Sequence, residues 1–288
     1  MAHIHPDPDK ALFWISEIES LLAASVNRTR LEKLIGRLCF AVYAVWGPPA
    51  RAYLTPLYSF FHGGGGRHHS SIRTCLSWWR SRLAGSVSRT WQFGTFRSQP
   101  LIAYSDAEGA GGLGWVLLAR PPSLESSKSG DPSLTGWWAG GAAPADLSAH
   151  LLPRKTQIHA LEMCAFISLI QSSATVLRGK RLLAFIDNQS ALGVLRKGSC
   201  KLAHDLSALS SYALDLCRGL HIELFLFWVP SALNCADGPS RGNPCPFGLR
   251  GRLLLQVQPL AAAISDPALR IQQFCAQPLR AKQDRNLR

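Results

Sequence analysis

Five short apolar runs between residues 101 and 229 constrain the fold of this 288-residue chain more than any other feature. Each has the length of a strand and is bounded by Gly, Pro, Ser or Asp, and helical patterns separate the later runs. The predicted strands are 101–105, 113–118, 135–139, 181–186 and 222–229. Three successive strands indicate an antiparallel meander, and strands alternating with helices indicate a parallel extension. We therefore predict an α/β fold with a mixed five-stranded sheet and flanking helices.

The rest of the chain differs from this region in pattern and charge. Apolar residues at helical spacing before residue 84 predict a small helical segment. The formal net charge of +13 favours a polyanionic partner, nucleic acid above all, and most of it lies outside the strand region. We predict three parts, with net charges of +7, +1 and +5: a basic helical segment at 1–97, the sheet domain at 98–242, and a basic linker or tail at 243–288.

Four carboxylates stand out. Asp106 and Asp187 each end a predicted strand, Glu162 lies in an otherwise apolar helical run, and Asp237 follows the last strand. Ligand sites in α/β sheets lie at the carboxyl ends of strands. Carboxylates gathered there cannot all ionise without a counter-cation, and oxygen ligands suit Mg²⁺ or Mn²⁺. A lone Asp after a strand is also a common turn residue or helix N-cap, so the predicted metal site depends on the joint pattern.

These four positions lie in motifs that resemble the type 1 ribonuclease H domain, in the form carried by retroelement reverse transcriptases. The resemblance covers about residues 98–242, and the stretch from Asn234 to Arg241, Asn-x-Ala-Asp-x-x-Ser-Arg, is similar to that of DIRS-like retrotransposons. The motifs are Ser105-Asp106-Ala107, Leu161-Glu162-Met163, Ile186-Asp187-Asn188-Gln189, and Trp228-Val229-Pro230-Ser231 followed by Asn234-Cys235-Ala236-Asp237.

The resemblance implies an enzyme, a phosphodiester hydrolase that cuts the RNA strand of RNA/DNA hybrids. The four carboxylates would be the catalytic residues and would hold two Mg²⁺ ions, with Mn²⁺ as an alternative. Gln189, with Asn188 beside it, would contact the substrate backbone. Arg37 and Arg80, on basic helix faces of the first segment, are predicted to contact phosphate, although such faces are often only solvated.

The first segment is similar, more loosely, to the thumb and connection that precede this domain in those polymerases. No Tyr-x-Asp-Asp palm motif is present, so we expect no polymerase activity from this chain and a separate polymerase subunit as a candidate partner. The cellular members of the family carry a His before the last Asp, and none lies between Trp228 and Asp237.

Two alternatives stay open. The chain could be a catalytically silent retroelement remnant that binds nucleic acid, or an integrase- or transposase-type nuclease, which shares the fold but needs three carboxylates. No apolar run approaches the 18 residues of a membrane span. We therefore expect no membrane partner. The eight cysteines form no close C-x-x-C pair, which favours reduced thiols and an intracellular location, in the nucleus or cytoplasm.

Overall fold

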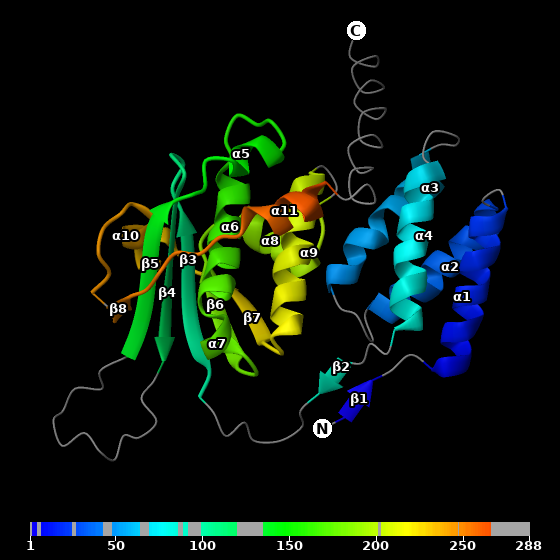
Figure 1. Cartoon of the computed structure of the whole chain (residues 1–288), viewed down its shortest axis with the longest axis horizontal. Coiled ribbons are helices and arrows are strands. Elements are labelled where there is room, and N and C mark those ends of the chain that lie inside the picture. The colour runs from blue at the N-terminus through cyan, green and yellow to red at the C-terminus, as the bar shows by residue number, and fades with distance from the viewer. Residues whose placement is uncertain are drawn as a thin grey trace, which may run out of the picture. The chain divides into compact units, whose positions relative to one another are not determined.

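The computed structural model describes residues 2–4, 7–24, 27–42, 48–63, 69–85, 89–91, 99–119, 135–200, 203–246 and 248–265. They form two compact units, one from the described residues of 1–94, 197–211 and 264–288, the other from those of 95–196 and 212–263 (Figure 1). The predicted domain boundary near residue 97 and most of the predicted tail, residues 266–288, lie outside the described residues.

The first unit is helical, as the apolar spacing predicts. Its first two helices begin at capping side chains: Asp7 accepts hydrogen bonds from the backbone N–H groups of Asp9 and Lys10, and Asn27 accepts one from that of Arg30. A buried core that includes Ile18, Leu34, Leu76 and Trp79 holds the helices together. The elements are β1 (Ala2–Ile4), α1 (Pro8–Ala23), α2 (Arg28–Ala41), η2 (Pro48–Tyr53), α3 (Thr55–Gly63), α4 (His69–Ala84) and β2 (Arg89–Trp91), with β1 and β2 paired antiparallel.

The second unit contains a mixed sheet with strand order β7-β6-β3-β4-β5-β8. Its strands are β3 (Leu101–Ala107), β4 (Gly112–Ala119), β5 (Thr135–Ala142), β6 (Arg181–Ile186), β7 (Glu223–Trp228) and β8 (Leu249–Arg250). The meander β3-β4-β5 is antiparallel, and β6 and β7 continue it in parallel from β3. The predicted α/β class with a mixed sheet is confirmed. The sixth strand, β8, was not predicted because its two residues show no periodicity.

Helices connect and flank the strands. The element α6 packs on β3 and β4, and its residues from Ala160 to Ile170 are all buried. The short element α10 lies against β3, β4 and β5. The remaining elements are α5 (Leu147–His150), α6 (Ile158–Ser172), α7 (Ala174–Leu177), α8 (Gln189–Lys197), α9 (His204–Gly219), η3 (Ser231–Leu233), α10 (Asp237–Ser240) and α11 (Val257–Ile264). Among the described residues, no helix has both the length and the apolar character needed to cross a membrane.

Candidate metal centre

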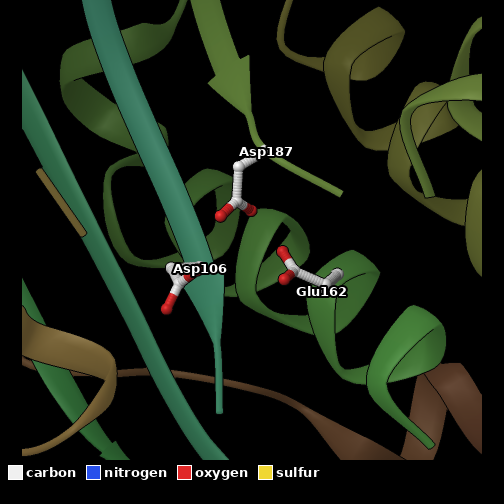
Figure 2. Close-up of side chains that lie close together, drawn as sticks. All are labelled: Asp106, Glu162 and Asp187. Atoms are coloured by element: carbon white, nitrogen blue, oxygen red, sulfur yellow. The ribbon is translucent and has the colours of Figure 1, made fainter. Parts of the chain in front are cut away.

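Three carboxylates from separate parts of the chain meet at one end of the sheet (Figure 2). Asp106 lies near the end of β3, Glu162 lies in α6, and Asp187 directly follows β6. One oxygen from each carboxylate lies within 4.8 Å of the other two. The parallel register of β3 and β6 sets Ser105 opposite Ile186, so the residues that follow them reach the same edge. We call Asp106, Glu162 and Asp187 the carboxylate triad.

Asp106 and Glu162 are buried, and their carboxyl groups resist ionisation. The exposed fractions of Asp106 and Glu162 are 5% and 3%. Burial, and then the charges of Asp106 and Asp187, raise the pKa of Glu162 from 4.5 to about 9, although a hydrogen bond from the backbone of Ala107 opposes the shift. Burial also raises the pKa of Asp106 from 3.8 to about 6. The triad therefore cannot carry three negative charges at neutral pH unless a cation shares the site.

Two oxygens of the triad lack hydrogen-bond partners, and this bears on whether a cation fits the site. Oε2 of Glu162 and Oδ1 of Asp187 are buried and accept no hydrogen bond from any described residue. Buried polar atoms without a partner are costly, so they indicate a missing ligand. Carboxylate oxygens in this number and arrangement suit a hard divalent ion such as Mg²⁺ or Mn²⁺. The three residues therefore fit a divalent cation.

Asp106 is oriented by two side chains that lie far from it in the sequence, near the C-terminal end of the predicted sheet domain. Its Oδ1 accepts a hydrogen bond from Nδ2 of Asn234 at 3.3 Å, and its Oδ2 accepts one from the hydroxyl of Ser240. Asn234 also donates to the carbonyl of Ser105 at 3.1 Å. Neither residue was predicted to have a role. The only signal was that both lie in the same Asn-x-Ala-Asp-x-x-Ser-Arg motif as Asp237.

Glycines allow the α10 segment to approach the sheet. A Cβ added to Gly112 would lie 1.9 Å from the carbonyl oxygen of Ser240, and one added to Gly114 would lie 2.3 Å from its backbone nitrogen. A Cβ on Gly140 would lie 2.0 Å from the carbonyl oxygen of Pro239. Any side chain at these positions would push α10 outward and separate Ser240 from Asp106.

The fourth predicted ligand, Asp237, stands beside the triad but is not a member of it. Among the described residues, the carboxylates whose oxygens lie within 4.8 Å of one another are those of Asp106, Glu162 and Asp187. Asp237 is the first residue of α10, and its Oδ1 accepts hydrogen bonds from both Nε and Nη2 of Arg241, at 3.0 and 2.9 Å. Its charge still contributes to the raised pKa of Asp106. Three of the four predicted carboxylates therefore assemble, and the fourth is ion-paired nearby.

The predicted substrate contacts lie in two places. Gln189 is the exposed first residue of α8, and Oδ1 of Asn188 accepts a hydrogen bond from the backbone of Ala191 at 3.0 Å. Arg37 pairs with Glu17, and Arg80 lies 3.9 Å from Glu19, both acidic residues being in α1. The two arginines therefore already have carboxylate partners, and their contact with phosphate stays a prediction.

Two further side chains lie beside the triad without having been predicted. Nδ1 of His159, one turn before Glu162, lies 3.2 Å from Oδ1 of Asn188. Nε1 of Trp228 donates a hydrogen bond to the carbonyl of Asp187 at 2.9 Å. Each therefore supports the turn that carries Asp187. No sequence pattern marks His159, whereas Trp228 belongs to the motif that precedes Asp237.

Comparison with protein-family models and with curated proteins found no match.

Proposed function

We propose that this chain is a metal-dependent endonuclease that hydrolyses the RNA strand of RNA/DNA hybrids, the ribonuclease H part of a retrotransposon reverse transcriptase. The observation that carries the proposal is the carboxylate triad. Two of its three members are buried, the three follow one another along the chain in the order of the ribonuclease H motifs, and two of its oxygens have no partner among the described residues. A site built in this way suits a divalent cation and phosphodiester chemistry better than a purely structural role.

The residues divide into those that would hold the cation and those that orient them. The triad would supply the ligand oxygens, and the bound ion would activate water and stabilise the leaving oxygen. Asn234 and Ser240 fix the carboxylate of Asp106, and Trp228 fixes the backbone at Asp187. Such outer contacts keep ligands in a productive geometry.

The substrate class is supported by charge and by the resemblance of the motifs. A net charge of +13 favours a polyanion, and recognition of a hybrid would depend on its phosphates, its shape and the 2′-OH of its RNA strand. Polymerisation is not part of the proposal, because the chain has no Tyr-x-Asp-Asp motif. A separate polymerase subunit is the partner that such an enzyme would need.

The test is cleavage of labelled substrates by the full chain with Mg²⁺. We expect the RNA strand of a hybrid to be cut and duplex DNA to be spared, with no cutting in EDTA. Asp187→Asn should abolish cutting but leave hybrid binding intact, because it removes a metal ligand and no basic group. Asp215→Asn, on the helix α9, changes a partly exposed carboxylate in the same way and should cut at the wild-type rate. Hybrid binding without cutting would favour the silent remnant.

One observation favours a second candidate. Because Asp237 lies outside the triad, the assembled cluster has the three carboxylates that an integrase- or transposase-type nuclease needs. That enzyme would join or nick DNA ends and would not prefer a hybrid. Incubation with double-stranded DNA ends and a target plasmid separates the two, since strand transfer without hybrid cleavage would exclude the ribonuclease.

A further inference from the structure

Asp237, the carboxylate that would complete the predicted metal centre, is ion-paired with Arg241. Both Nε and Nη2 of Arg241 donate to the same oxygen of Asp237, at 3.0 and 2.9 Å. We propose that Arg241 is a resident counter-cation for Asp237, so that the triad binds one divalent ion tightly and a second ion, at Asp237, binds only weakly. The inference rests on the metal centre of the proposed function and not on its substrate.

The triad qualifies as the first ion position on two independent grounds. Its oxygens converge within 4.8 Å. Glu162, with an exposed fraction of 3%, directs an unpartnered buried oxygen into the cluster. Asp237 has neither property, since it is partly exposed and its Oδ1 is already hydrogen-bonded. The four carboxylates therefore offer two unequal positions.

Arg241 lies in the negative field that would attract a second ion. The hydrogen bond and charge of Asp237 raise the pKa of the Arg241 guanidinium, and the charges of Asp106 and Glu108 contribute to the same shift. A second divalent ion at Asp237 would enter the same field and would be repelled by the guanidinium. One fixed positive charge therefore takes the place that the four-carboxylate motif leaves for a metal.

The backbone that follows Asp237 packs closely against the sheet. The glycine contacts described above hold Pro239 and Ser240 directly against β4 and β5. The side chains of Asp237 and Arg241 are both accessible to solvent, with exposed fractions of 44% and 54%. Exposed ion pairs are weak and are screened by salt, so a second ion at high concentration should displace the guanidinium.

Ion binding to the full chain without substrate tests the proposal. Mn²⁺ is titrated and the free ion is followed by electron paramagnetic resonance, with Mg²⁺ calorimetry in parallel. We expect the wild type to bind one ion tightly and a second at least tenfold more weakly. We expect Arg241→Gln to tighten the second ion by about tenfold, because a positive charge a few ångströms away would no longer repel a divalent ion. Arg241→Lys, which keeps the charge, should resemble the wild type.

Two further variants complete the test. Arg218→Gln removes a similarly exposed arginine that pairs with Asp215 three residues earlier, and should resemble the wild type. Adding Asp237→Asn to Arg241→Gln should remove the tightened second ion. The proposal is overturned if Arg241→Gln titrates like Arg218→Gln, or if the wild type binds two ions equally or none. Unequal binding in a protein that cuts no hybrid would refute the proposed nuclease and leave this inference standing.

Discussion

Replacing Glu162 with Gln should stabilise the metal-free protein at neutral pH. Burial, and then the neighbouring carboxylates, raise the pKa of Glu162 from 4.5 to about 9. The folded chain therefore retains a proton that the unfolded chain has released, so stability is lost as the pH rises from 4.5 towards 9. One pKa unit corresponds to about 1.4 kcal/mol, so at pH 7 the carboxyl group costs on the order of 3 kcal/mol. Glutamine keeps the shape and cannot ionise, and it should recover that amount.

Urea unfolding of the full chain in EDTA measures this gain. Because the chain has two units, hydrogen exchange of peptides from β3 and α6 is followed in parallel, so that unfolding of the sheet unit is measured separately. The gain should become small near pH 4.5, where the wild-type carboxyl is protonated in the folded chain and half protonated in the unfolded chain. Glu223→Gln, at an exposed position of β7, is the control and should change little. Mg²⁺ should reverse the order, because it stabilises only a chain that can bind it well. A Gln variant no more stable than the wild type at pH 7 would refute the reasoning.

Three other predictions concern the surroundings of the triad. Ser240→Ala removes a hydroxyl that orients the first ligand and should slow hybrid cleavage by about tenfold or more without unfolding the chain, whereas Ser231→Ala, at an exposed position, should cleave normally. Gly114→Ala places a Cβ 2.3 Å from a backbone nitrogen of α10 and should lower the free energy of unfolding in urea by about 1–3 kcal/mol. Gly193→Ala, in α8 with nothing within 4 Å, should raise it by up to about 1 kcal/mol. Calorimetric Mg²⁺ affinity should fall as the pH is lowered from about 9, because Glu162 must lose its proton to bind the ion; affinity unchanged down to pH 6 would contradict the raised pKa.

The sheet was predictable because its strands are long enough to show a pattern. The five predicted runs correspond to β3 to β7, and the change from a meander to alternating strands and helices correctly indicates where parallel pairing begins. Features that depend on contacts between distant residues were not predictable. The two residues of β8 are too few to show a hydrophobic periodicity. The pairing of Arg37 and Arg80 with acidic residues of α1 depends on how the helices pack.

The same distinction explains why three of the four predicted carboxylates form a cluster and the fourth does not. The triad is tied to regular elements: the register of β3 and β6 brings Asp106 and Asp187 to one edge, and the packing of α6 on β3 and β4 adds Glu162. Asp237 lies in a four-residue helix, where an arginine four residues later indicates an ion pair as readily as the motif indicates a metal ligand. Asn234 and Ser240 reach Asp106 across 128 and 134 residues, a link that no local pattern contains. Motif order therefore predicts which carboxylates share an end of the sheet, but the charge of Arg241 decides whether Asp237 is available to a metal.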